Sequence, residues 1–105
     1  MHAQIIAYCL KSISEADYRD QTVKPDAQIL AAVPWPHSKV WLSNQQANTY
    51  GRFYLWNDRS PMETFMASDI IKAVVARPFL EGVHSEDYAV PGDASRVTRW
   101  LSAAS

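Results

Sequence analysis

Four short apolar segments alternate with helical patterns along the chain, and each is typical of a β-strand. Residues 3–10 form a compact apolar run with two isoleucines, which predicts a buried strand. Residues 38–43 and 49–56 flank the polar stretch 44–48, and this arrangement predicts a β-hairpin. Residues 83–90 predict the last strand, because proline and glycine follow it directly.

The segment between the first two strands predicts a helix with an irregular middle. Ser14 is a good N-cap, and acidic residues follow it in the first turn, where they suit the helix dipole. We expect the helix to run to about Val33, with Ile29 and Leu30 on its buried side. Pro25 lies inside this span and removes one backbone donor, so a kink or a break is expected within about one turn of it.

The segment after the hairpin predicts a second helical region in two pieces. Ser60, Pro61 and Glu63 occupy the preferred cap, first and third positions of a helix. A second piece is expected after Ser68, and it ends at Arg77, just before a proline. The apolar residues expected on the buried side of these pieces are Met62, Phe65, Met66, Ile70, Ile71, Val74 and Val75.

The predicted order of elements is β-α-β-β-α-β over 105 residues. That order at this length predicts an α+β, ferredoxin-like fold, in which helices cover one face of a four-stranded antiparallel sheet. The sequence has no internal repeat and no linker-like stretch. We therefore expect one domain over residues 1–105, with residues 92–105 as a C-terminal tail.

Side chains of a strand point alternately to its two faces, so the hairpin pattern predicts which residues share a face. In the third strand Phe53 and Leu55 form one apolar row, and in the second strand Val40 and Leu42 form another. We expect these rows to pack against the helices, because amphipathic helices need an apolar surface beneath them. The opposite face would then carry Lys39, Trp41, Tyr50, Arg52, Tyr54 and Trp56.

An exposed sheet face with two tryptophans and two tyrosines would be a larger apolar patch than monomers usually carry. A second copy of the same sheet would cover it, because two-fold dimers are the commonest closed assembly. The sequence therefore predicts a homodimer through the sheet faces. Aromatic walls with a few cations would also suit a flat, partly anionic organic molecule.

Charge and composition exclude several classes of partner. Ten Lys and Arg residues against eleven Asp and Glu give a net charge of −1 without basic runs, which argues against nucleic acid. No apolar stretch reaches the roughly 18–20 residues that span a membrane, and the run at residues 5–10 is too short for a signal peptide. Cys9, His37 and His84 form no spaced metal-binding set. We expect a cytoplasmic protein without metal or cofactor.

Three stretches of the chain resemble the YdhR-like family of proposed monooxygenases. They are Pro34 with Ser38-Lys39-Val40-Trp41-Leu42, Asn48-Thr49-Tyr50-Gly51 with Tyr54-Leu55-Trp56, and Arg96-Val97-Thr98-Arg99. The resemblance covers residues 4–99 and implies a dimeric α+β barrel. The wider superfamily contains cofactor-free monooxygenases of aromatic polyketides, and also haem-degrading, isomerising and dismutating members. Pro25 and Trp35-Pro36 depart from the family pattern of an unbroken first helix and a glycine-containing turn.

Trp56, at the end of the third strand, matches the place where oxygenases of this superfamily often carry a pocket tryptophan. The alternative is a tryptophan of the core or of the dimer interface, since aromatic residues dominate both. Trp41 and Tyr54 share its predicted face and leave the same alternative open. The Tyr54 hydroxyl could bind a substrate oxygen or transfer a proton.

Lys39 and Arg52 are cations on the same predicted aromatic face, and burying a cation without a partner is costly. A substrate anion such as a phenolate or an enolate could pair with them and be stabilised as it reacts. The alternatives are a structural salt bridge to Glu86 or Asp87, or a Lys39 side chain that extends to solvent.

These residues and the resemblance together predict a cofactor-independent monooxygenase of a small aromatic or polyketide-like substrate. In that reaction the deprotonated substrate supplies the electron to dioxygen, so neither flavin nor metal is required. The alternative is a protein of the same fold that binds a small molecule without turnover. Haem degradation is disfavoured, because residues 72–77 lack the histidine that haem-degrading members carry on this helix.

Overall fold

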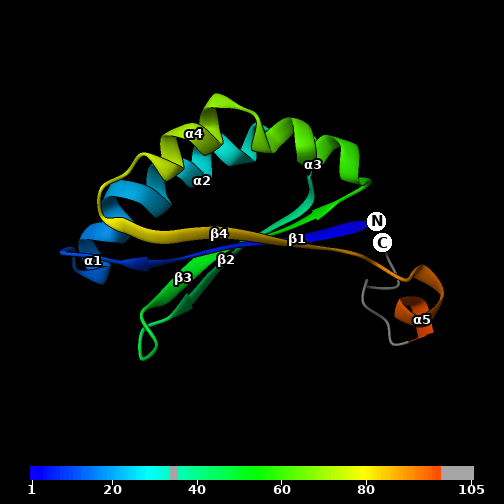
Figure 1. Cartoon of the computed structure of the whole chain (residues 1–105), viewed down its shortest axis with the longest axis horizontal. Coiled ribbons are helices and arrows are strands. Elements are labelled where there is room, and N and C mark those ends of the chain that lie inside the picture. The colour runs from blue at the N-terminus through cyan, green and yellow to red at the C-terminus, as the bar shows by residue number, and fades with distance from the viewer. Residues whose placement is uncertain (34–35, 98–105) are drawn as a thin grey trace.

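The computed structural model describes residues 1–33 and 36–97 (Figure 1). Its elements in chain order are β1 (His2–Leu10), α1 (Glu15–Tyr18), the π-helical segment η1 (Arg19–Val23), α2 (Lys24–Ala31), β2 (Pro36–Asn44), β3 (Thr49–Trp56), α3 (Arg59–Met66), α4 (Asp69–Val75), β4 (Leu80–Ala89) and α5 (Gly92–Val97). Pro34, Trp35, Thr98 and Arg99 lie outside the described residues, as do the side chains of His37 and Arg96.

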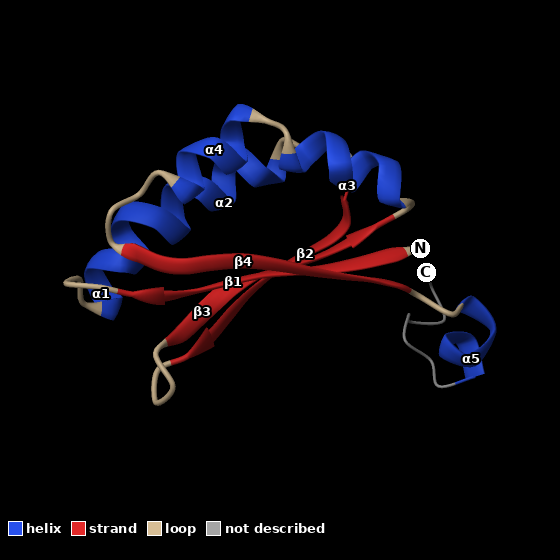
Figure 2. Ribbon diagram, in the orientation of Figure 1, coloured by secondary structure: helices blue, strands red, loops and turns tan. Residues whose placement is uncertain are grey.

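Within the described residues, one sheet of four strands has the order β2-β3-β1-β4, and every neighbouring pair is antiparallel. Helices α1 to α4 lie over one face of this sheet, and α5 lies beyond the end of β4 (Figure 2). The predicted α+β, ferredoxin-like arrangement is confirmed. Since β1 and β3 are the central strands, their helix-facing side chains form the floor of the core.

The first helical region begins and is interrupted where the sequence predicted. The Ser14 hydroxyl accepts a hydrogen bond from the Asp17 amide at 3.1 Å and caps α1. The α-helical pattern then changes to the π-helical segment η1, and Pro25 follows near the start of α2. There the Lys24 amide donates to the Arg19 carbonyl, five residues earlier. This wider turn accommodates a proline whose ring would clash with the carbonyl four residues before it in a regular helix.

The second helical region and the last strand differ from the prediction at their boundaries. Asp58, rather than Ser60, caps α3, and its carboxylate accepts a hydrogen bond from the Arg59 amide. β4 begins at Leu80 instead of Val83, because it pairs with β1 as far as that residue. The expected C-terminal tail contains the short helix α5.

The predicted orientation of the sheet is wrong, because the aromatic and charged row of β3 faces the helices. The side chains buried there are Tyr50, Arg52, Tyr54 and Trp56 of β3 and His2, Gln4, Ile6 and Tyr8 of β1. The helices meet this row with polar and aromatic partners rather than with a purely apolar surface. Asp26 of α2 bonds Arg52, and Phe65 of α3 packs on Trp56 at 5.3 Å between ring centroids.

The opposite face of the sheet carries the predicted apolar rows and is open over β2, whereas Leu55 of β3 is only 4% exposed. Val40 and Leu42 of β2 are 48% and 38% exposed. Phe53 pairs with Val40 across the hairpin and with Ile5 of β1, so these apolar side chains share that face. The surface that a second copy would have to cover therefore carries Val40, Leu42, Ile5 and Phe53, and not the predicted row of two tryptophans and two tyrosines.

Candidate active site

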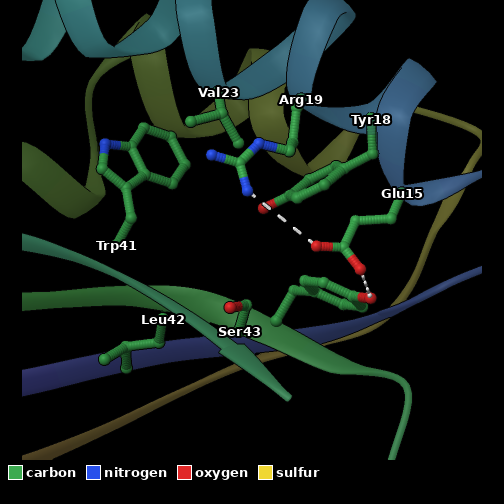
Figure 3. A pocket seen from close by; sticks show the side chains of 8 residues that line it. Glu15, Tyr18, Arg19, Val23, Trp41, Leu42 and Ser43 are labelled. Carbon is green, nitrogen blue, oxygen red and sulfur yellow. Dashed lines mark hydrogen bonds and ion pairs between the residues drawn. The ribbon is translucent and has the colours of Figure 1, made fainter. Parts of the chain in front are cut away.

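A cavity of about 210 Å³ lies between the first helical region and the hairpin (Figure 3). Its lining residues are Glu15, Tyr18, Arg19, Val23, Trp41, Leu42, Ser43 and Tyr50. Figure 3 shows the Trp41 ring and Tyr18 on the walls, whereas the Leu42 side chain points away to the other side of its strand. The helical region thus supplies one wall, and β2 and β3 supply the other.

The polar groups of the cavity are tied together at one end. The Tyr50 hydroxyl donates a hydrogen bond to Glu15 Oε2 at 3.1 Å, and Arg19 Nη1 lies 4.0 Å from Glu15 Oε1 (Figure 3). Tyr18 packs against Tyr50 at 5.2 Å between ring centroids. Aromatic walls closed by a carboxylate and a guanidinium can hold a flat organic molecule and orient its polar end.

Behind Tyr18 the side chains are fully buried and still polar. The Tyr8 and Tyr18 hydroxyls are 2.7 Å apart and share a hydrogen bond. Burial and this bond raise the pKa of Tyr18 well above its ordinary value, so the phenol stays neutral. The inner side of the cavity therefore carries the neutral phenol of Tyr18, with Tyr8 buried behind it.

Arg52 lies behind Trp41 and is held by a carboxylate. Its guanidinium carbon is 4.6 Å from the centre of the Trp41 ring, a cation–π contact. Its Nη2 donates to Asp26 Oδ2 at 2.6 Å. Asp26 also accepts two hydrogen bonds from Arg77, at 2.6 and 2.7 Å. The salt bridge expected for Arg52 exists, but its partner is Asp26 rather than Glu86 or Asp87.

A family model described as "Putative mono-oxygenase ydhR" matches residues 6–100. The chain belongs to the ydhR family. This confirms the resemblance carried by the hairpin and its flanking segments. No curated protein sequence matches the chain.

Solved structures show the same fold as this ydhR-family chain at low sequence identity. A protein of unknown function from Nitrosomonas europaea, NE2512, is 17% identical, with 86% of this chain and 88% of that chain covered and a TM-score of 0.72. An antibiotic biosynthesis monooxygenase, described as putative, from Deinococcus radiodurans is 13% identical (86% and 92% covered, TM-score 0.69). SnoaB from Streptomyces nogalater, described as a cofactor-independent oxygenase, is 13% identical (86% and 92%, TM-score 0.66).

In this ydhR-family structure the five predicted site residues share one face of the sheet, as expected. That face is covered by the helices and not by a second copy of the sheet. Pairing of Lys39 with Tyr54 and of Trp41 with Arg52 places these residues together. Trp41 lines the cavity, and Arg52 lies directly behind it. Tyr54 is fully buried beside Arg52, and burial raises the pKa of its hydroxyl, which the nearby guanidinium offsets in part.

Trp56 and Lys39 have structural partners. Trp56 is 0% exposed, packs on Tyr54 at 5.6 Å between centroids, and donates from Nε1 to Gln4 Oε1 at 2.9 Å. Lys39 Nζ donates to the backbone carbonyls of Leu30 and Val33, which end the first helical region. Burial lowers the pKa of Lys39. Lys39 is thus half-buried, forms no ion pair among the described residues, and satisfies helix-end carbonyls.

The sequence interpretation missed the residues that the helix contributes. Tyr18, Thr22 and Asp26 recur every four residues and are all buried, which is the spacing of one helix face. That stripe could have been found from the sequence. The stripe contains a phenol, a hydroxyl and a carboxylate, and it crosses the predicted break at Pro25. It therefore lacks the apolar periodicity that usually marks the buried face of a helix.

Metal ligands are not grouped in the described structure. Within residues 1–33 and 36–97, no group of three or more His, Cys, Asp or Glu side chains is placed to hold a metal ion. His84 pairs with Ala7 on the open face, is exposed, and bonds the Gly82 carbonyl at 3.0 Å. No helix in the described part of the chain is long and apolar enough to cross a membrane.

Proposed function

We propose that this ydhR-family protein is a cofactor-independent monooxygenase that oxidises a small aromatic or polyketide-like substrate in the cavity between the sheet and the helices. The observation that carries the proposal is the aromatic cavity with Trp41 on its wall and the Arg52 guanidinium directly behind that ring. Membership of a family described as mono-oxygenases supports it. SnoaB, which shares the fold, is itself described as a cofactor-independent oxygenase.

The proposed reaction uses the substrate as its own reductant. An activated methylene of an anthrone-type ring loses a proton, and the resulting anion passes an electron to dioxygen. The two radicals combine at carbon to a peroxide anion, this anion takes up a proton, and the resulting hydroperoxide loses water to give a ketone. The methylene thus loses two hydrogens and gains one oxygen atom, and the second oxygen leaves as water.

In this scheme the chain orients the substrate and stabilises its anion. Trp41 stacks on the flat ring, Arg52 stabilises the negative charge, and Tyr54 exchanges a proton. Lys39 and Trp56 contribute by fixing the end of α2 and the position of Tyr54. A preorganised cation in a site from which water is excluded stabilises charge more strongly than it would in water.

Oxygen uptake tests this function directly. The protein incubated with a reduced anthrone-type substrate is expected to consume dioxygen and to form the ketone in air, with no product under nitrogen. Replacing Trp41 with alanine is expected to lower kcat/KM about tenfold or more, because one aromatic wall is lost. Val75→Ala on α4 is the control and should leave the rate unchanged, because the prediction that Val75 and Ile29 are buried is wrong: they are 56% and 51% exposed.

The alternative function is small-molecule binding without turnover. It would be supported if the aromatic ligand bound in calorimetry, if Trp41→Ala weakened that binding, and if no dioxygen were consumed. The cavity suits this alternative equally well, because it binds a flat ring with the same residues. Oxygen uptake above the uncatalysed rate would exclude it.

We also propose that two copies associate through the open face of the sheet. Val40 and Leu42 are exposed there beside Phe53 and Ile5, and such a patch is costly to leave in water. Light scattering at micromolar concentration is expected to give about twice the chain mass of 11.9 kDa. Val40→Glu should shift the protein toward the monomer, and Val75→Glu, on a helix, should not. A wild-type mass of one chain would contradict the proposal.

We expect the protein to work in the cytoplasm. Its single cysteine, Cys9, is a free thiol on β1. A thiol that forms no disulfide is compatible with a reducing compartment. Fractionation of cells that express the protein would test this expectation.

A further inference from the structure

The charged side chains behind Trp41 are two arginines and one aspartate, so their charges do not cancel. Asp26 is one carboxylate, with a side chain 7% exposed, and two guanidiniums bond it. Arg77 uses both of its Nη atoms on both carboxylate oxygens, so this pair is satisfied by itself. Arg52, 2% exposed, adds only one hydrogen bond through Nη2. Two cations against one anion leave one positive charge.

The neighbouring phenols cannot supply the missing negative charge. Tyr18 and Tyr54 both have raised pKa values, chiefly because they are buried, so each is neutral near pH 7. Glu15 bonds Tyr50 and lies near Arg19 at the cavity's polar end. The group of Arg52, Asp26 and Arg77 therefore keeps a net positive charge, since an arginine side chain does not lose its proton in proteins, and Arg52 is its fully buried end.

Two buried hydroxyls belong to the elements that hold this charge: Thr22 lies one helical turn before Asp26 on the same buried face, and Tyr54 lies beside Arg52. Tyr54 and Thr22 are 0% exposed, and neither hydroxyl forms a hydrogen bond of normal geometry among the described residues. The same holds for Nε and Nη1 of Arg52, although this guanidinium lies close enough to the Tyr54 hydroxyl to lower its pKa in part. Each buried polar atom without a partner costs free energy, and several around one cation indicate a group that is bound there.

The cavity and this cluster meet at Trp41, and none of Arg52, Tyr54 and Thr22 lines the cavity itself. Trp41 lines the cavity on one side, and its ring contacts the Arg52 guanidinium. Val23, which directly follows Thr22 in η1, lines the cavity too. Trp41 is half-buried on the edge strand β2.

We propose that Arg52, Tyr54 and Thr22 bind a singly charged oxygen group of the ligand, a carboxylate or a phenolate, while its aromatic ring occupies the cavity beside Trp41. The ligand class is thus a monoanionic aromatic acid or phenol. The single excess charge selects a monoanion over a neutral analogue. This inference rests on the proposed function only in taking the ligand to be the substrate, because binding itself requires no turnover.

The test compares two ligands of one shape. Calorimetry with the full chain is expected to show that 2-naphthoate binds about tenfold or more tightly than the neutral 2-naphthamide. Tyr54→Phe and Thr22→Val should each weaken naphthoate binding about tenfold and leave naphthamide nearly unchanged. Arg52→Lys, which keeps the charge, should retain part of the preference for naphthoate.

Stability gives a second readout that separates ligand binding from a purely structural role. Tyr54→Phe and Thr22→Val each remove an unpartnered buried hydroxyl, so the unliganded variants should unfold at the same or a higher urea concentration than the wild type. Tyr88→Phe removes an exposed hydroxyl that bonds Glu86 and is the matched control for both measurements.

The outcomes separate this inference from the proposed function. Equal affinities for the two ligands, or variants that lose stability without losing selectivity, would overturn the anion site and indicate that water fills the cluster. Selective naphthoate binding without oxygen uptake from any anthrone-type substrate would support the site and refute the monooxygenase. Oxygen uptake without charge selectivity would refute the site alone.

Discussion

Replacing Trp56 with alanine is expected to lower the free energy of unfolding by about 3–5 kcal/mol, because a fully buried indole leaves a large cavity. The ring is 0% exposed and packs on Tyr54 and on Phe65 at 5.6 and 5.3 Å between centroids. The substitution also leaves Gln4 Oε1 without the Nε1 donor that lies 2.9 Å away. Urea denaturation monitored by circular dichroism measures the loss.

Trp41→Ala is the matched control, because Trp41 is half-buried on an edge strand. It should cost clearly less stability than Trp56→Ala and should instead weaken the binding of a flat aromatic ligand. If Trp56→Ala abolished binding and left the unfolding transition in place, the aromatic row of β3 would lie in a binding site rather than in the core.

Which residues share a face could be predicted from the sequence. Alternation along a strand is a geometric property, so Arg52, Tyr54 and Trp56 had to lie together. The hairpin then determined that Lys39 and Trp41 joined them, since they pair directly with Tyr54 and Arg52. The alternation within β3 depends only on local geometry, whereas the match between the rows of β2 and β3 depends on the hairpin register, which the loop residues do not fix.

Which face the helices cover could not be predicted in this way. Both rows of β3 are largely apolar, so the preference depends on partners distant in sequence. Asp26 supplies a carboxylate to Arg52 from 26 residues away, and Phe65 supplies a ring to Trp56. Without knowledge of those partners, burying an arginine beneath a helix is costly and was the less favoured choice.

The candidate site was predictable only where it depends on the hairpin. Trp41 was identified because it shares a strand face with the aromatic row. The cavity itself depends on how the first helical region lies on the hairpin, where Glu15 bonds Tyr50. The bond from Lys39 to backbone carbonyls of α2 depends on where that helix ends in space, and backbone carbonyls leave no residue-type signal in a sequence.

Replacing Asp26 with asparagine is expected to destabilise the protein by about 3–5 kcal/mol at neutral pH, because it leaves a buried cation uncompensated. The asparagine side chain has nearly the same shape as aspartate but no charge to oppose Arg52, which is 2% exposed. Arg77 is partly exposed and could turn to solvent, whereas Arg52 could not. Chemical denaturation at neutral pH gives the difference in unfolding free energy.

Two further variants define the cause of that loss. Asp20→Asn removes an exposed carboxylate that pairs with Lys24 at 2.8 Å, and it should change stability by about 0.5 kcal/mol or less. Adding Arg52→Met to Asp26→Asn removes the uncompensated cation and should restore much of the lost stability. If the double variant were no more stable than Asp26→Asn alone, the loss would come from packing rather than from charge.

The same carboxylate predicts how stability depends on pH. Burial alone would raise the pKa of Asp26, but the hydrogen bonds and charges of Arg77 and Arg52 outweigh it and lower that pKa below its ordinary value of 3.8. The unfolded chain therefore takes up this proton first, so the contribution is present above about pH 4 and is lost as the pH falls toward the folded-state value. Between about pH 5 and pH 3, the wild type should lose more stability than Asp26→Asn. If the unfolding free energies of the wild type and of Asp26→Asn fell in parallel over this pH range, the titration of Asp26 would not contribute to the pH dependence of stability.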